Sequence, residues 1–250
     1  MRELKIDRVT KYYGAFKALD NVELTIKPQE FMVVMGPSGC GKTTLLLVIL
    51  GVLNPDEGHI LLDGRAIDDL PIEERNISYV PQDFGLFPHL TVYGNVAFGL
   101  KVRGYPEDKT RGEVDRLLAA VDLQGLEERK PKELSAGQRQ RVALARALAT
   151  NPFVLLLDEP LSNIDEATKA EVRENLKAFV AKTRITTVCV THNPEDAFEL
   201  GDRIAVMFSG RIIQCDSPLN LLQEPVNEAV KRLIAPMYLL WNVKGKEQSF

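Results

Sequence analysis

The chain has 250 residues, of which 45% are hydrophobic, so it can bury a substantial core in one large domain or two small lobes. Its 31 basic and 35 acidic residues give a net charge of −4, which provides no strong electrostatic footprint for nucleic acid or anionic lipid, and we expect no nucleic-acid partner. The cysteines Cys40, Cys189 and Cys215 are odd in number and widely spaced, which argues against a disulfide framework or a zinc site and indicates a reducing compartment.

The amino-terminal residues MRELKIDRVT alternate charged and apolar side chains and lack the apolar region and cleavage site of a signal peptide. The longest apolar run, residues 45–53, is about half as long as a membrane span requires. We therefore expect a chain that is not exported and does not cross a bilayer, so that any membrane role depends on a partner.

Two kinds of strand pattern occur along the chain. Residues 4–9 and 19–27 alternate apolar and polar side chains, which predicts half-buried antiparallel strands. Residues 31–35, 153–158 and 186–192 are instead almost continuously apolar, as is typical of central parallel strands that are covered on both faces.

Helical patterns lie between these strands. They begin at Lys42 and run through residues 113–123, 137–149 and 166–183. Alternating strands and helices predict an α/β fold with a mainly parallel sheet. The segment from about 84 to 150 holds several helical patterns and no convincing strand, which predicts a helical subdomain inserted into the α/β core.

The stretch GPSGCGKT, residues 36–43, follows a predicted buried strand and precedes a predicted helix. Gly36, Gly41, Lys42 and Thr43 satisfy the phosphate-loop pattern G-x-x-x-x-G-K-[ST] in the context that the pattern requires. Glycines let the backbone N–H groups turn towards phosphate oxygens, and the start of the helix adds its positive dipole end. The residues expected to bind nucleotide phosphates here are Gly36, Pro37, Ser38, Gly39, Cys40, Gly41, Lys42, Thr43 and Thr44.

A second candidate component lies at FVLLLDEP, residues 153–160. Asp158 ends an apolar strand, where burying a carboxylate is costly without a cation or hydrogen bonds, and a Mg²⁺ ion held jointly with Thr43 is the expected partner. Glu159 is placed to orient or deprotonate a water molecule, although a solvated strand-end carboxylate is the alternative interpretation.

The stretch LSAGQRQRVALARAL, which begins at Leu134 some twenty residues before LLLDEP, resembles the signature of ABC transporter ATPase subunits, usually LSGGQ. The resemblance covers roughly residues 3–235 and implies the P-loop NTPase fold, with a RecA-like core, an antiparallel β subdomain and the helical insertion. Ala136 replaces the usual glycine, which should be tolerated if the backbone there is not at positive φ. In this family the signature, here Ser135, Ala136, Gly137 and Gln138, covers the γ-phosphate held by a partner, which implies a head-to-tail dimer around two ATP molecules.

Four further positions match the family in order. Tyr13 corresponds to the aromatic residue that stacks on adenine, although a core or edge-strand tyrosine is the alternative interpretation. Gln82 corresponds to the glutamine that contacts Mg²⁺ and water and connects to the membrane subunit. Asp165 corresponds to a residue that contacts the other subunit, and His192 to the switch histidine near the γ-phosphate, where a surface or capping histidine is the alternative.

The resemblance implies in-line attack of water on the γ-phosphate of ATP. Glu159 would act as base or water-orienting group, with Lys42, Gln82 and His192 completing the catalytic set. The implied Mg²⁺ ligands are Thr43, Gln82 and Asp158. A GTPase would require an N-K-x-D motif, which the sequence lacks, and a small-molecule kinase would not carry the signature stretch.

Residues 81–100, PQDFGLFPHLTVYGNVAFGL, are dense in aromatic and apolar side chains. They could form the core of the helical subdomain, or Phe84, Leu86, Phe87 and Leu90 could line a groove for a short helix of a membrane permease. The stretch GLFPHLTV resembles cassettes of importers that work with an extracytoplasmic substrate-binding protein. This implies a peripheral protein on the cytoplasmic face of the cell membrane.

The expected domain boundaries are 1–235 for the ATPase domain and 236–250 for a short tail, without the β-rich regulatory domain of many importer cassettes. Two alternatives to import stay open: a cassette for lipid or lipoprotein extraction or for export, and a soluble ATP-driven clamp.

Overall fold

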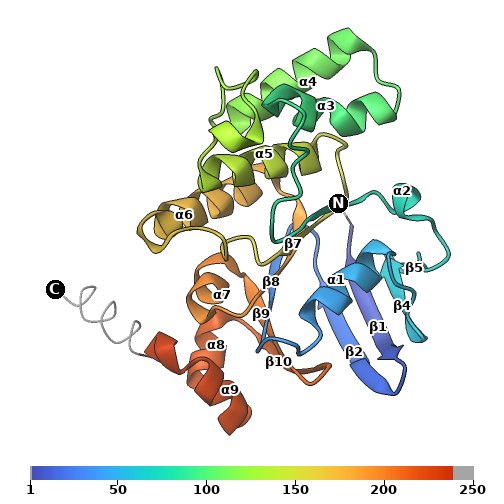
Figure 1. Ribbon diagram of the computed structural model, residues 1–250. Helices are drawn as coiled ribbons and strands as arrows, with labels where there is room; N and C mark the ends of the chain where they lie inside the picture. The colour runs from blue at the N-terminus through green and yellow to red at the C-terminus, as the bar shows by residue number, and fades with distance from the viewer. Residues whose placement is uncertain (1, 239–250) are drawn as a thin grey trace. The chain divides into compact units, whose positions relative to one another are not determined.

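The computed structural model describes residues 2–238 (Figure 1). The chain folds into two compact units. The first unit combines the amino-terminal segment up to Arg75 with the segment from Thr186 onward, and the second unit is the intervening segment Asn76–Ile185.

The first unit contains an antiparallel sheet in the order β2-β1-β4-β5. Its strands are β1 (Leu4–Tyr13), β2 (Phe16–Ile26), β4 (Glu57–Leu62) and β5 (Arg65–Ala66). The alternation predicted for the second of these strands is confirmed, because Val22, Leu24 and Ile26 are all buried on one face.

The strands β10-β9-β3-β8 form the other sheet region of this unit, where β3 pairs in parallel with both β8 and β9. Their bounds are β3 (Phe31–Met35), β8 (Thr186–Thr191), β9 (Arg203–Phe208) and β10 (Arg211–Asp216). Every residue of β3 and β8 is buried, which confirms that continuous apolar runs mark strands covered on both faces.

In the described part of the chain the first unit also contains five helices: α1 (Lys42–Leu50), α2 (Ile72–Arg75), α7 (Pro194–Leu200), α8 (Pro218–Gln223) and α9 (Glu228–Leu233). Helix α1 begins at Lys42, as predicted, and contacts β2 and β8. The buried Arg75 guanidinium donates to the carbonyls of Val48 and Ile49 and so satisfies the end of this apolar helix.

The second unit pairs β6 (Ile77–Val80) in parallel with β7 (Val154–Asp158). Helices α3 (Val92–Val102), α4 (Glu107–Ala120) and α5 (Ala136–Leu148) follow β6 and contact one another, and α6 (Glu166–Thr183) follows β7 (Figure 1). A short 3₁₀ helix, Pro131–Glu133, precedes α5. Within the described chain, the segment between β6 and β7 is helical and contains no strand, as expected for an inserted helical subdomain.

The α6 bounds match the predicted helix, whereas α4 begins six residues before the predicted start at residue 113. Its first turn carries Glu107 and Asp108, whose negative charges favour a helix start by interacting with the positive end of the helix dipole. The tail predicted at 236–250 lies mostly outside the described residues.

Candidate nucleotide site

The phosphate loop leaves the end of β3 and turns into α1. Gly41 lies at φ 108°, in the left-handed region, and a Cβ placed on it would come within 2.5 Å of the carbonyl oxygen of Ala18. Only glycine fits this position, so the sequence constraint has a direct steric cause. Helix α1 starts immediately afterwards, which points its amide groups and positive dipole end at the loop.

The Lys42 side chain folds back over the loop. Its Nζ donates to the carbonyl oxygens of Gly36, at 2.8 Å, and Pro37, at 3.1 Å, and the residue is buried. The ammonium group is therefore held inside the curve of the loop, where a phosphate oxygen would replace a carbonyl as its partner. A cavity of 220 Å³ adjoins the loop and is lined by Phe16, Lys17, Ala18, Pro37, Ser38, Gly39, Cys40, Phe208, Ser209 and Gly210.

The exposed His192 lies at the same edge of the sheet as the start of the loop. Met35 pairs with Thr191 in the parallel β3–β8 ladder, and the amide of Gly36 donates to the carbonyl of Thr191 at 3.4 Å. The alternative of a capping histidine does not apply, because Asn193 caps α7 by accepting from the amides of residues 195 and 196.

Tyr13 is the last residue of β1 and is 48% exposed, which excludes a core role. The backbone beside it is anchored by Asp56, whose carboxylate accepts from the amide of Tyr12 at 2.6 Å and from Lys11 Nζ at 3.1 Å. These two hydrogen bonds, the amide of Tyr12 first, lower the pKa of Asp56 below its ordinary value.

In the second unit, Asp158 ends β7 and is only 6% exposed. The hydroxyl of Tyr79, on β6, donates to Asp158 Oδ2 at 3.0 Å. Burial, with the negative charge of Asp158, raises the pKa of Tyr79, so this hydroxyl keeps its proton and acts as the donor. A buried carboxylate at a strand end fits Mg²⁺, which prefers oxygen ligands.

Glu159 follows at φ 46°, a left-handed conformation that a glutamate rarely adopts. Its carbonyl oxygen accepts from the amide of Ser162 at 3.1 Å and from the Ser162 hydroxyl at 2.9 Å, which closes a tight turn. Backbone strain of this kind gathers at functional sites, where the surrounding structure holds it in place.

Gln82 is exposed and lies just beyond β6. Val80 pairs with Leu157 in the parallel ladder, so Gln82 and the Asp158–Glu159 pair leave the strands at the same edge. Asn163 Nδ2 donates to the carbonyl oxygen of Gln82 at 2.8 Å and ties the loop after β6 to the loop after β7.

The signature stretch begins α5. Ser135 caps the helix, accepting from the amide of Gln138 at 3.2 Å, and the Gln138 side chain accepts from the amide of Ser135 at 3.0 Å. Ala136 is the first helical residue and has no positive φ, which meets the condition under which alanine is tolerated there. A Cβ on Gly137 would lie 3.1 Å from Val172 on α6, so this glycine also serves helix packing.

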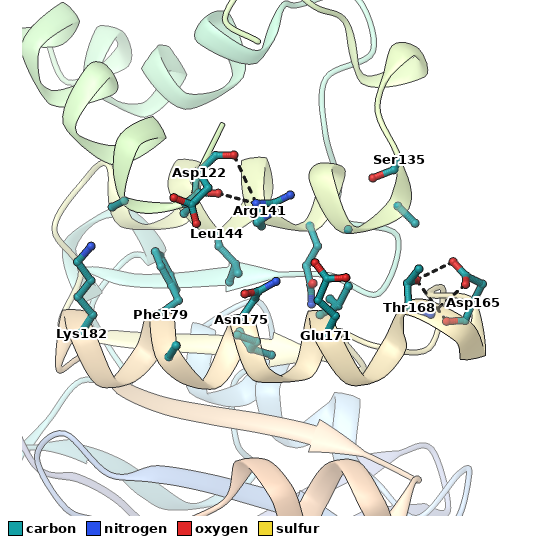
Figure 2. A pocket seen from close by; sticks show the side chains of 18 residues that line it. Asp122, Ser135, Arg141, Leu144, Asp165, Thr168, Glu171, Asn175, Phe179 and Lys182 are labelled. Carbon is teal, nitrogen blue, oxygen red and sulfur yellow. Dashed lines mark hydrogen bonds between the residues drawn. The ribbon is translucent and has the colours of Figure 1, made fainter. Parts of the chain in front are cut away.

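Asp165 caps α6, accepting from the amide of Thr168 at 3.1 Å and from its hydroxyl at 2.8 Å. A groove of about 340 Å³ runs between α5 and α6, with Ser135 and Asp165 near one end and Lys182 near the other (Figure 2). Leu144 and Phe179 lie between these two ends of the groove.

The four apolar residues predicted to line either a core or a docking groove differ in their burial. Phe84 is buried, whereas Leu86, Phe87 and Leu90 are only partly covered. The ring of Phe87 packs against Phe98 of α3, with ring centroids 4.5 Å apart. Phe98, Val102 and Tyr105 are exposed on and just after α3.

The family model described as ABC transporter matches residues 19–162. The chain belongs to the ABC transporter family. It is 42% identical to a molybdate/tungstate import ATP-binding protein WtpC of Pyrococcus abyssi, with 92% of this chain and 67% of the relative covered. It is 44% identical to a spermidine/putrescine import ATP-binding protein PotA of Oleidesulfovibrio alaskensis, with 93% of this chain and 62% of that relative covered.

A third relative, a sulfate/thiosulfate import ATP-binding protein CysA of Synechococcus elongatus, is 43% identical, with 96% of this chain and 70% of the relative covered. The chain thus spans between 62% and 70% of the length of these three relatives. Among solved structures it resembles CbiO1 from Clostridium perfringens, at a TM-score of 0.82 and 31% identity over 96% of this chain and 98% of that one. It also resembles the dimeric ATP-binding cassette MJ0796 bound to ADP and Pi. The TM-score is 0.75 and the sequence identity 35%, with 86% of this chain and 98% of that one covered.

The fold is accordingly that of a P-loop NTPase, and the chain is an ABC ATP-binding cassette of the importer type. It is an ATPase that uses ATP and Mg²⁺. This membership confirms the resemblance and sets aside the GTPase and kinase alternatives. In the part of the chain that the structure describes, no helix has both the length and the apolar character to span a membrane.

Four residues around the site were not identified from the sequence: Tyr79, Gln140, Arg146 and Asn163. Gln140 donates to the carbonyl oxygen of Pro160 at 3.0 Å, and Arg146 donates to the carbonyls of Phe84 and Gly85 at 3.0 and 2.7 Å. All four act through contacts across strands or helices, for which a single sequence carries no local signal.

Proposed function

We propose that this cassette forms a head-to-tail dimer around two Mg-ATP molecules and drives a membrane permease, most simply for solute import. The observation that carries the proposal is the arrangement at the start of α5. There the reciprocal hydrogen bonds of Ser135 and Gln138 hold a turn of small residues, and Ser135 is exposed. Such a turn offers backbone amides to an anion from outside, as a partner's γ-phosphate would require.

The proposed roles within the nucleotide site follow the chemistry of each side chain. Lys42 binds the β- and γ-phosphates, while Thr43, Gln82 and Asp158 hold Mg²⁺, which supplies charge neutralisation on the phosphates when bound. Glu159 orients or deprotonates the attacking water, and His192 binds developing charge on the γ-phosphate. Tyr13 stacks on adenine.

The remaining nucleotide contacts are proposed to lie across the dimer. Ser135, Ala136 and Gly137 contact the γ-phosphate of the partner's nucleotide, with Gln138 shaping the turn through its capping bond. Asp165 faces the partner from the capped start of α6. The hydrogen bonds from Thr168 lower the pKa of Asp165 and keep its carboxylate ionised. An ionised carboxylate favours an ion pair or hydrogen bond with the partner.

The permease is proposed to dock on the helical subdomain, residues 84–150 of the 1–235 ATPase domain. Phe98, Val102 and Tyr105 expose apolar surface on and after α3, next to the partly covered Phe87. Exposed apolar surface of this kind suits an amphipathic helix of a membrane subunit. The relatives are named as import proteins, which favours import, a peripheral position at the cytoplasmic face of the membrane and an extracytoplasmic binding protein that acts through the permease.

The first experiment replaces Glu159 by Gln and measures ATPase activity and mass in solution by light scattering. The variant should lose turnover by a factor of at least about 100, because the water is no longer activated, and should form a dimer with ATP but not with ADP. The matched control is Glu174→Gln, at an exposed position of α6, which makes the same chemical change and should behave as the parent. Normal turnover in Glu159→Gln would remove Glu159 from this role.

The second experiment isolates the tagged chain from its native membranes in mild detergent and identifies co-purifying chains by mass spectrometry. A stoichiometric multi-span protein is the expected result. Recovery of soluble partners only, with no cassette in the membrane fraction, would overturn the transport proposal and favour the ATP-driven clamp.

A further inference from the structure

The hydrogen bond between Tyr79 and Asp158 joins two neighbouring strands at the edge where the proposed metal ligand lies. Tyr79 pairs with Leu156 in the parallel ladder of β6 and β7. Because side chains alternate along a strand, Asp158 lies on the same face as Leu156, two residues further along. The ring of Tyr79 can therefore run along the ladder and present its hydroxyl to Oδ2, at 3.0 Å.

This contact restricts the carboxylate in a way that packing alone would not. Asp158 is almost fully covered, and a hydroxyl that donates to one of its oxygens fixes the rotation of the carboxylate plane. In metal sites, partners that bind the outer oxygen or nitrogen of a ligand orient it, and their loss typically costs a factor of about 10 to 100 in metal affinity or activity.

We propose that Tyr79 is a positioning residue, which holds the carboxylate of Asp158 in the orientation that binds the Mg²⁺ of the nucleotide. This inference rests on the proposed function, in which Asp158 is a ligand of that ion. Tyr79 itself touches neither the metal nor ATP. It acts only through Asp158.

A purely structural role would give a different result. If the bond merely satisfied a partly buried hydroxyl, its loss would lower the stability of the fold and leave the metal dependence of the site unchanged. A positioning role instead changes the affinity for the cation and leaves metal-free nucleotide binding as it was.

The test is Tyr79→Phe, which keeps the ring and removes only the hydroxyl. Tyr93→Phe is the matched control, because the hydroxyl of Tyr93 also donates to a carboxylate, Glu107 Oε1, at 3.0 Å in the same unit. Mn²⁺ serves as the probe: its affinity for the ADP-loaded cassette is read from the electron paramagnetic resonance signal of unbound Mn²⁺. The Mg²⁺ dependence of ATPase activity is measured in parallel.

The dissociation constant for Mn²⁺ should rise about tenfold in Tyr79→Phe and change less than about twofold in Tyr93→Phe. The Mg²⁺ concentration for half-maximal ATPase activity should rise similarly, with activity recovered at high Mg²⁺. Binding of a fluorescent ATP analogue in EDTA should match the parent, which also shows that the variant is folded. Parental Mn²⁺ affinity and Mg²⁺ dependence in Tyr79→Phe would overturn the proposal.

Asp158→Asn separates this proposal from the one on which it rests. The variant should lose Mn²⁺ affinity more severely than Tyr79→Phe, since a charged ligand is removed. If Asp158→Asn bound Mn²⁺ like the parent, the proposed role of Asp158 would fail. If Tyr79→Phe bound Mn²⁺ like the parent and Asp158→Asn did not, the role of Asp158 would stand and that of Tyr79 would fail.

Discussion

Gln140 Nε2 donates to the carbonyl oxygen of Pro160 at 3.0 Å, so helix α5, which begins with the signature, holds the residue that follows Glu159. Gln140 is only 1% exposed, and its amide is a buried group in a helix whose other inward residues are mostly apolar. This hydrogen bond joins the helix that begins with the signature to the turn that carries Glu159.

Replacing Gln140 by Met should preserve the volume of the side chain and remove the donor. The carbonyl of Pro160 then loses a buried partner, which should lower the free energy of unfolding by about 1–3 kcal/mol. We also expect kcat for ATP hydrolysis to fall roughly tenfold while KM for ATP stays within about twofold, because the turn of Glu159 loosens and the phosphate loop does not.

Steady-state kinetics and urea unfolding of Gln140→Met test this expectation. Asn175→Met, at an exposed position of α6, is the control for adding a methionine near the same groove and should leave both quantities unchanged. A Gln140→Met enzyme with parental kcat and reduced stability would show that the bond serves the fold alone.

The sequence predicted those parts of the fold that depend on local patterns. The apolar runs at residues 31–35 and 186–192 marked buried strands, and the phosphate-loop motif placed the start of α1 at Lys42. Helix α3 was missed because VYGNVAFGLKV contains two glycines and several β-branched residues, which have low helix propensity. Its buried Asn95 stabilises the preceding loop by donating to the carbonyls of Phe87 and Thr91.

The contacts that complete the candidate site could not be predicted in the same way. Tyr79 reaches Asp158 only because β6 and β7 pair in a particular register, and register is a property of two distant segments. The signature was found from the family resemblance, and Asp158 and Glu159 from their place at the end of an apolar strand, while the contacts of Gln140 and Asn163 required the structure. The strands β4, β5, β6, β9 and β10 also had no prediction, since they are short or have mixed patterns.

Acid should weaken the hydrogen bonds that Asp56 accepts from the amide of Tyr12 and from Lys11, next to Tyr13. The pKa of Asp56 is lower in the folded chain than the value of about 3.9 expected when unfolded. Its contribution to stability is therefore fully present above that unfolded pKa and is lost as the pH falls through the folded pKa. Between about pH 5 and pH 3 the parent should lose more stability than Asp56→Asn, which lacks the titrating group.

Urea unfolding of both proteins across this pH range measures the difference, and the other titrating groups cancel in the comparison. At pH 7, Asp56→Asn should also bind ATP roughly two- to fivefold more weakly, because the backbone next to Tyr13 is held by weaker, uncharged bonds. Parallel pH profiles for the two proteins would contradict the first expectation, and parental ATP affinity would contradict the second.

Glu159 illustrates a conflict between stability and activity. Its φ of 46° is unfavourable for glutamate, whereas asparagine adopts left-handed backbone more readily. Glu159→Asn should therefore abolish ATP turnover and raise the free energy of unfolding by up to about 1 kcal/mol.

The measurement is urea unfolding, in which the midpoint should rise while the slope stays constant. The control is Glu174→Asn, at an exposed position inside α6, which should lose a few tenths of a kcal/mol because asparagine is a poorer helix former (roughly 0.3). A Glu159→Asn variant that is no more stable than the parent would mean that the turn closed by Ser162 accommodates glutamate without strain.

Gly137 should not tolerate alanine, although its neighbour Ala136 already carries a methyl group. In an ordinary helix this change stabilises by up to about 1 kcal/mol. Here the new Cβ would lie 3.1 Å from Cγ2 of Val172, which is itself 9% exposed. A β-branched side chain in a helix has one strongly preferred rotamer, so Val172 cannot turn away at low cost, and α5 must shift from α6.

We expect Gly137→Ala to reduce ATPase activity about fivefold or more, and to weaken the ATP-dependent dimer formed in the Glu159→Gln background, because the signature turn moves with α5. Adding Val172→Ala removes the clashing methyl groups and should restore most of the activity, with a coupling energy of about 0.5–3 kcal/mol in the double-mutant cycle. Additive losses in Gly137→Ala, Val172→Ala and the double variant would show that the glycine is required for close approach to the nucleotide rather than for its contact with α6.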